Sequence, residues 1–121
     1  MIEGKFSSRG ELFFEIDFVA SDGLIITVDA LLDTGFTDWL AINKQDAISL
    51  GWQLVNNDET RLTALGEGQF SIYAGTVNLD GQMFNIPVIG GDAITEVLLG
   101  LPWLFTRKLV VDFPENFLTL G

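Results

Sequence analysis

The chain has 121 residues and contains neither histidine nor cysteine, which excludes a Ser-His-Asp relay, a thiolate nucleophile, an imidazole metal site and disulfides. Its formal net charge of −11, with only six Lys and Arg scattered along the chain, argues against a nucleic-acid partner. No apolar run approaches the roughly 18 residues of a membrane span, and the N-terminus lacks a signal-peptide pattern, so we expect one soluble, cytoplasmic domain over residues 1–121 with no membrane partner.

Hydrophobic alternation predicts a strand near the N-terminus. Residues 14–18 alternate between apolar and acidic side chains, which is the two-residue period of a half-buried strand. The Ser21-Asp22-Gly23 segment is typical of a turn, so this strand is expected to pair with residues 24–32 as a hairpin. The second strand becomes apolar on both faces towards its end, which indicates a buried, central position.

Two short helical segments are predicted. Residues 44–50 are expected to form a helix that Asn43 caps and Gly51 follows, in a position that favours a left-handed residue. Three of its side chains are expected to face inward: Ala47, Ile48 and Leu50. A helical turn is expected to follow Pro102, within residues 102–107, because proline is tolerated in the first turn of a helix.

Two further hairpins are expected from turn chemistry. Gly66-Glu67-Gly68 is expected to join residues 61–65 to 70–77, and Asp80-Gly81 to join residues 76–79 to 83–89. Residues 110–113 and 116–120 read as closing strands. Short strands, regular turns and one conspicuous helix predict a mainly β protein, a small β-barrel or sandwich rather than a βαβ fold.

The most informative segment is Leu31-Leu32-Asp33-Thr34-Gly35. An Asp-Thr-Gly tripeptide alone is more often a turn than an active site. Here the aspartate ends a strongly apolar strand, and Gly35 allows a tight backbone and the close approach of another chain or ligand. Because the chain lacks His and Cys, carboxylates are its leading candidates for acid–base chemistry. One form of that chemistry uses two aspartates that share a proton.

These residues resemble the retropepsins, the single-domain aspartic proteases related to the retroviral proteases. The resemblance has three parts in the family's order: the run that ends at Gly35, a glycine-bearing hairpin near Gly66-Glu67-Gly68 in the place of the flap, and Val97-Leu98-Leu99-Gly100, which looks like the family's paired hydrophobics and glycine. The Asp-Thr-Gly-Phe form also looks like a prokaryotic clan of small retropepsin-like proteins. The resemblance implies a small closed or partly open β-barrel of the retropepsin type.

The resemblance also implies a mechanism that needs no cofactor, no metal and no covalent intermediate. Each subunit of a homodimer would supply one Asp33, and a water held between the two carboxyl groups would attack a peptide bond. Thr34 would brace the two loops, and the Gly35 backbone would contact the peptide or protein substrate. The hairpin around Gly66, Glu67 and Gly68 would close over the substrate. The Leu98-Leu99-Gly100 segment would support the loop, and a shared proton implies an acid-leaning pH optimum.

Two departures from the family bear on these expectations. Phe36 stands where a small residue is common and is expected to narrow the substrate groove. Leu101-Pro102-Trp103 stands where viral enzymes carry a charged or polar residue at the subunit contact. Two other functions therefore stay open: a non-catalytic retropepsin-like dimer that binds peptides or partner proteins, and a plain β-domain in which Asp33 caps a turn. A calcium loop is discounted because the acidic residues near Asp33 lack its spacing.

Overall fold

A computed structural model describes residues 1–63 and 66–121 of the chain, and for residues 57–63 and 66–69 it describes the backbone alone. Its strands are β1 (Ile2–Glu3), β2 (Lys5–Phe6), β3 (Leu12–Val19), β4 (Ile25–Leu32), β5 (Leu40–Asn43), β6 (Gln53–Thr63), β7 (Gly66–Leu79), β8 (Gln82–Gly91), β9 (Leu98–Leu99), β10 (Leu109–Asp112) and β11 (Phe117–Leu120). Two helical elements accompany them, α1 (Lys44–Ser49) and the 3₁₀ helix η1 (Leu101–Phe105). Within the described ranges, no helix combines the length and the apolar character needed to cross a bilayer.

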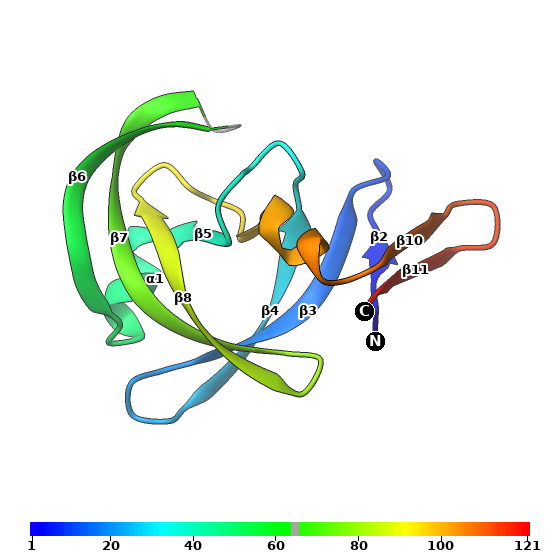
Figure 1. The fold of residues 1–121 in the computed structure, drawn as a ribbon, viewed down its shortest axis with the longest axis horizontal. Coiled ribbons are helices and arrows are strands. Elements are labelled where there is room, and N and C mark those ends of the chain that lie inside the picture. Colours follow the sequence, from blue (N-terminus) through cyan, green and yellow to red (C-terminus); the bar gives the residue numbers. More distant parts are fainter. Residues whose placement is uncertain (64–65) are drawn as a thin grey trace.

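The main sheet closes into a barrel, so the predicted mainly β fold is confirmed. Eight strands follow the order β2-β3-β4-β9-β5-β8-β7-β6, and a further pairing of β3 with β7 closes the sheet, as the curved strands of Figure 1 show. The closing pairs are Asp17 with Asn78 and Phe18 with Val77. The pairs β4–β9 and β5–β8 are parallel, whereas the hairpins β3–β4, β6–β7 and β7–β8 are antiparallel.

The alternation in β3 places its apolar side chains inside the barrel. Phe14, Ile16 and Phe18 are buried, and they belong to one core cluster with Trp103 of η1. The predicted turn at the end of β7 is also confirmed, because Asp80 and Gly81 have φ angles of 56° and 75°. Two successive left-handed residues match the twist of a two-residue hairpin connection.

Helix α1 begins where the sequence predicts. The Asn43 side chain accepts a hydrogen bond from the Gln45 amide at 2.9 Å, which satisfies one of the free amides at the helix start. Ala47 and Leu50 are buried as expected, but the expectation that Ile48 faces inward is wrong, because 52% of its surface is exposed. Successive helical residues lie about 100° apart around the axis, so Ile48 is turned away from the face that buries Ala47.

Asn43→Ala is expected to lower the free energy of unfolding by about 1–2 kcal/mol, because it removes the cap and the donor that bonds the Ile94 carbonyl at 3.1 Å. Urea unfolding followed by tryptophan fluorescence measures this loss. Asn43→Ser is the matched control, since its hydroxyl keeps the cap but does not reach across to Ile94. A loss as large in the serine variant as in the alanine variant would contradict a contribution from the cap.

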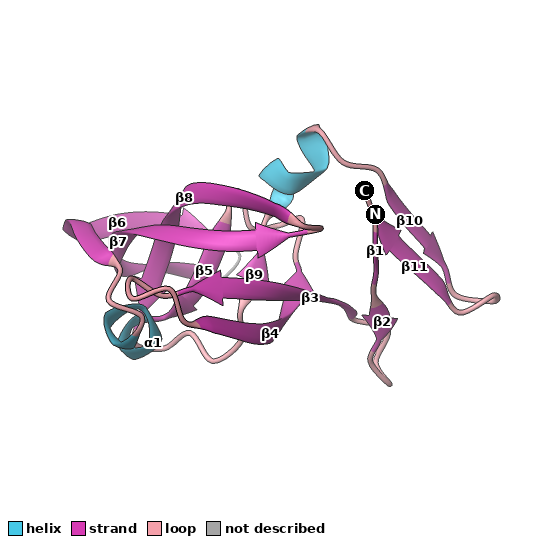
Figure 2. Cartoon of the chain, turned by 90° about the horizontal axis from the view of Figure 1, so that it is seen from below, coloured by secondary structure: helices cyan, strands magenta, loops and turns pink. Residues whose placement is uncertain are grey.

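A second, three-stranded sheet joins the two ends of the chain. Its strand order is β1-β11-β10, with both pairings antiparallel. Figures 1 and 2 show this sheet beside the barrel, with the β10–β11 hairpin extending away from it. The two closing strands predicted by the sequence are confirmed as β10 and β11, whereas the two-residue β1 is too short to show a periodic pattern.

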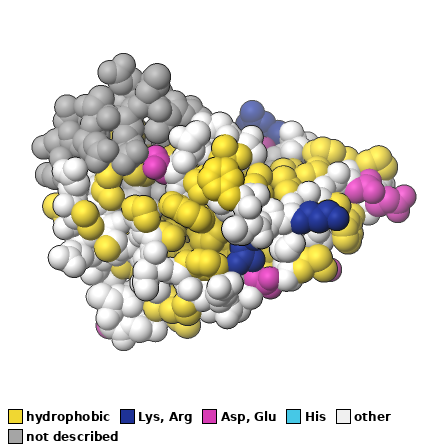
Figure 3. Space-filling view, viewed as in Figure 1, with side chains coloured by type: hydrophobic (Ala, Val, Ile, Leu, Met, Phe, Trp, Pro, Cys, Tyr) yellow, Lys and Arg dark blue, Asp and Glu magenta, His cyan; other side chains and the backbone are white. Residues whose placement is uncertain are grey.

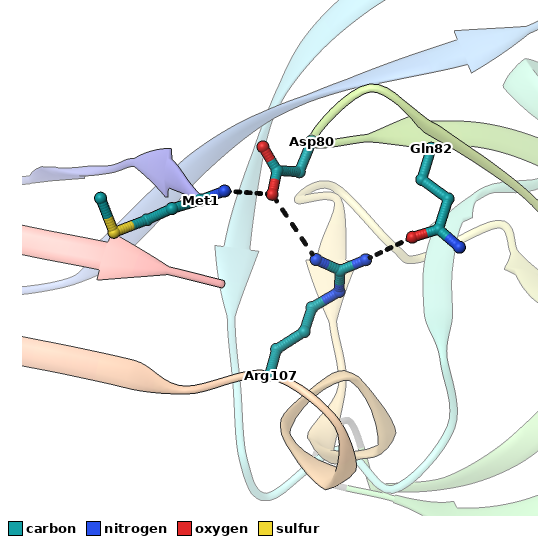
Figure 4. A network of polar contacts seen from close by, with 4 residues as sticks. All are labelled: Met1, Asp80, Gln82 and Arg107. Carbon is teal, nitrogen blue, oxygen red and sulfur yellow. Dashed lines mark hydrogen bonds and ion pairs between the residues drawn. The ribbon is translucent and has the colours of Figure 1, made fainter.

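Arg107 links this terminal sheet to the turn between β7 and β8 (Figure 4). Its guanidinium donates to the Gln82 side chain at 3.3 Å, lies 3.9 Å from the Asp80 carboxylate, and sits over the Phe84 ring at 5.3 Å from the ring centre. Asp80 also pairs with the amino group of Met1. A guanidinium suits this position because it can donate hydrogen bonds in its plane while its face stacks on an aromatic ring.

Candidate functional site

Asp33 lies directly after β4, in a tight turn made by its own backbone and side chain. The Gly35 amide donates to Asp33 Oδ1 at 2.9 Å, and the Phe36 amide donates to the Asp33 carbonyl at 3.1 Å. The Asp33 side chain is half-buried, while Thr34 and Gly35 are exposed. One carboxylate oxygen is thus held in a defined direction at the surface, and Oδ2 has no hydrogen-bond partner among the described residues.

The Leu98-Leu99-Gly100 segment lies against this turn, so the structure brings two of the three predicted site elements together. Strand β9 runs parallel to β4, with Leu98 beside Leu31 and Leu99 beside Leu32. The Asp33 amide donates to the Leu99 carbonyl at 2.9 Å, which fixes the start of the turn. Because β9 lies between β4 and β5, the loop that joins these strands must pass over its end.

Gly100 occupies the point at which this crossing is tightest. An added Cβ would lie 1.6 Å from the Asp38 carbonyl oxygen and 2.8 Å from the Phe36 carbonyl oxygen. Both obstacles are backbone atoms, which cannot move aside as a flexible side chain can. Its backbone conformation is ordinary, with φ of −92°. Space alone therefore requires glycine at this position.

Phe36 anchors the loop in the interior. It is completely buried in a second core cluster with Ile72, Ile89, Ile94 and Leu98. The expectation that Phe36 narrows a substrate groove is therefore not met in this structure, because the ring points into the protein. The apolar Phe36 side chain stabilises the loop by being removed from water. The same cluster joins the Asp33 loop to strand β7 through Ile72.

Two tryptophans fix the far end of the loop, and the sequence alone did not indicate this role. The Trp39 carbonyl accepts hydrogen bonds from the Gly100 amide at 3.1 Å and from Trp103 Nε1 at 2.7 Å. The rings of Trp39 and Trp103 pack edge to face with centres 4.9 Å apart. A buried indole N–H needs a hydrogen-bond acceptor. A tryptophan expected to be buried was therefore the one feature of the sequence that indicated a carbonyl group nearby.

The predicted flap is a hairpin, but its connection lies earlier than expected. Gly66, Glu67 and Gly68 do not form the turn; they begin β7 and pair with Thr63, Leu62 and Arg61 of β6. The antiparallel register continues to Thr63 and Gly66 and leaves the connection to residues 64–65, which lie outside the described residues. In Figure 1 the far ends of β6 and β7 rise at the same end of the barrel as the loop between β4 and β5.

The arrangement can supply one oriented carboxylate, from a chain that has no histidine or cysteine. A general acid and a general base are both needed to hydrolyse a peptide through an activated water, and one carboxyl group cannot fill both roles in the same step. A single chain supplies one such carboxyl group, at Asp33, whereas chemistry of the shared-proton kind requires two.

Comparison with solved structures identifies the fold. A retropepsin-like aspartic protease from Rickettsia conorii superposes with a TM-score of 0.67 at 25% sequence identity, over 98% of this chain and 88% of that chain. The EIAV protease in complex with the inhibitor HBY-793 gives 0.63 at 17% identity, over 88% and 99% of the two chains. The simian foamy virus (mac) protease gives 0.52 at 20% identity, over 80% and 99%.

The sequence itself gives no such match: no protein-family model matches the chain, and a search of curated proteins finds no relative. The fold is that of the retropepsin-like aspartic proteases, and the predicted fold class is confirmed to that level.

Proposed function

We propose that the chain is an aspartic endopeptidase that acts as a homodimer, with Asp33 of each subunit facing the other across a two-fold axis. The observation that carries this proposal is the oriented, half-buried Asp33 carboxylate beside Leu99 in a retropepsin-like fold. The neighbour from Rickettsia, which covers nearly the whole chain, favours the prokaryotic form of the family over the viral form.

In the proposed dimer the two carboxyl groups share one proton, since two adjacent negative charges are unfavourable. The ionised Asp33 takes a proton from a water molecule that lies between the pair. The resulting nucleophile attacks the peptide carbonyl, while the protonated Asp33 donates to the developing oxyanion. The Asp33 that took the proton from water then passes it to the leaving amine nitrogen as the carbon–nitrogen bond breaks. The other Asp33 regains its proton as the carbonyl group re-forms, and no covalent intermediate forms.

Thr34, Gly35 and the β6–β7 hairpin have supporting roles in this proposal. Thr34 and Gly35 are exposed, which leaves them free to meet the second loop and the substrate backbone respectively. The hairpin that contains Gly66, Glu67 and Gly68 closes over the bound peptide and excludes water. Exposed hydrophobic side chains, among them Phe105 at 72%, offer surface for a second subunit or a peptide, as Figure 3 illustrates for one face.

Cleavage of a denatured protein mixture across pH 3–8, with and without a pepstatin-type inhibitor, tests the proposed activity. We expect faster cleavage at the acidic end, because the shared proton is lost as pH rises and the general acid disappears with it. The inhibitor is expected to stop cleavage. A rate that rises steadily from pH 5 to pH 9 would contradict a shared-proton pair, and no cleavage by a stable dimer would favour a peptide-binding protein.

A further inference from the structure

A cavity lies mainly along the half of β4 that is farther from Asp33. It has a volume of about 300 Å³ and opens to solvent between the β3–β4 hairpin and helix α1. Buried Phe18 and Leu50 form part of its wall. This volume is at the lower end of the range for small-molecule sites, which are concave and largely apolar.

A partly exposed row of apolar side chains lines the cavity, from Leu24 just before β4 to Val28 within it. Leu24, Ile26 and Val28 alternate along the strand, so their side chains share one face, and all three line the cavity. Leu24 is 60% exposed and Ile26 is 40% exposed. Apolar side chains gathered at a concave surface gain free energy when a ligand removes them from water.

Among the residues whose side chains the structure describes, the charged ones that line this cavity have one sign. They are Asp22, in the turn between β3 and β4, and Asp46, in the first turn of α1, and both are exposed. Asp22 Oδ1 accepts from the Leu24 amide at 3.0 Å, which holds this carboxylate beside the apolar row. The overall charge of −11 adds to the negative potential.

We propose that this cavity binds a small ligand that carries an aliphatic chain and a positively charged ammonium group. The chain lies along Leu24, Ile26 and Val28, and the ammonium group lies between Asp22 and Asp46. A neutral ligand of the same length lacks the ionic contribution, and an anionic one is repelled. The apolar chain thus provides binding, and the positive charge provides the preference for this ligand over a neutral or anionic one.

The cavity wall contacts the residues just before β6. A bound ligand is therefore expected to stabilise the end of the β6–β7 hairpin that begins at Gln53. Trp52 packs edge to face on Phe18 with ring centres 5.4 Å apart, and its Nε1 donates to the Val19 carbonyl at 2.9 Å. The Ser21 amide donates to the Leu50 carbonyl at 2.9 Å. A ligand that rests on Phe18 and Leu50 stabilises this junction. A consequence for cleavage follows only from the proposed function, whereas ligand binding is independent of it.

Titration of the ¹⁵N-labelled protein with n-octylammonium, n-octanol and n-octanoate, followed by amide chemical shifts, tests the site. Saturable shifts are expected at residues 20–24 and 46–50, with octylammonium binding about fivefold more tightly than octanol because of two exposed ion pairs. Octanoate is expected to bind most weakly. Equal affinities for the three ligands, or shifts centred elsewhere, would overturn the proposal.

Two variants separate the charge from the cavity. Asp22→Asn/Asp46→Asn is expected to remove the preference for octylammonium, and the side-chain amide oxygen introduced at position 22 can still accept from the Leu24 amide. Asp92→Asn/Glu115→Gln makes the same change in net charge at exposed positions outside the cavity and is expected to keep the preference. Ser49→Phe fills the cavity and is expected to abolish saturable binding. Unchanged binding in either cavity variant, checked for folding by its amide spectrum, refutes the assignment.

Hydrogen exchange tests the link to the hairpin. Saturating octylammonium is expected to slow exchange severalfold at the amides of Gln53 and Leu54, which begin β6. Exchange that is unchanged at these amides, with binding demonstrated, would overturn the link. If the protein cleaves no peptide, the proposed function fails, but the shift and exchange results still decide this inference.

Discussion

Asp33→Asn is expected to reduce peptide cleavage by about 10³-fold or more, because the proposed dimer then lacks both the base and the acid that would act on the water. The fold is expected to persist. The amide oxygen of the introduced asparagine can still accept the hydrogen bond that the Gly35 amide now donates to Asp33 Oδ1 at 2.9 Å. Cleavage rates at the acidic optimum, together with the urea midpoint, measure the two effects separately.

The control for this substitution is Asp92→Asn, which makes the same chemical change at an exposed position in another loop. Its cleavage rate is expected to stay within about twofold of the wild type, as for surface substitutions in general. Equal cleavage by the wild type and by Asp33→Asn would remove Asp33 from the mechanism.

Gly100→Ala is expected to lower the free energy of unfolding by about 3 kcal/mol or more, since overpacking against immovable atoms is costly. The added methyl group would meet the Asp38 carbonyl oxygen at 1.6 Å. Relief requires the loop between β4 and β5 to move, which disturbs the hydrogen bond from the Leu101 amide to the Phe36 carbonyl at 2.8 Å. Cleavage is expected to fall with stability because that loop carries Asp33.

Gly23→Ala separates crowding from backbone strain. Gly23 has a φ of +90° and nothing within 4 Å of an added Cβ, so alanine there incurs only the strain of a left-handed residue, about 1–2 kcal/mol. Urea unfolding of both variants makes the comparison. A loss at Gly100 no larger than the loss at Gly23 would contradict the tight crossing.

Local signals were sufficient for much of the fold. The alternation in residues 14–18 identified β3, and the Asp80-Gly81 pair identified the turn between β7 and β8. Asn43 marked the start of α1 through a hydrogen bond within two residues of it. In each case the pattern depends on neighbours in the sequence, where side-chain periodicity and capping act directly.

Features that depend on distant contacts were not predicted. Strands β1 and β9 have two residues each, and their pairing depends on partners more than 55 residues away. The burial of Phe36 and the exposure of Ile48 likewise follow from what packs against them. The connection of the β6–β7 hairpin was assigned to the glycines, although the strand register extends through them.

The candidate site shows the same division. The sequence indicated Asp33 and the Leu98-Leu99-Gly100 segment separately, and the structure places them in contact through the hydrogen bond from the Asp33 amide to Leu99. The contribution of Trp39 and Trp103 to the loop was not predicted. It depends on a hydrogen bond from the Trp103 indole to the Trp39 backbone carbonyl, and every residue has such a carbonyl. The pairing of two Asp33 residues lies beyond one chain and stays a prediction.

Mixing wild-type protein with Asp33→Asn tests the paired-aspartate proposal most directly. After the subunits of an equal mixture have exchanged, cleavage is expected to be about one quarter of that of wild-type protein at the same total concentration, since only dimers with two Asp33 residues act. A mixture with Asp92→Asn is the control and is expected to retain full activity. Cleavage at about one half in the Asp33→Asn mixture, as expected for subunits that act alone, would contradict a site shared by two chains.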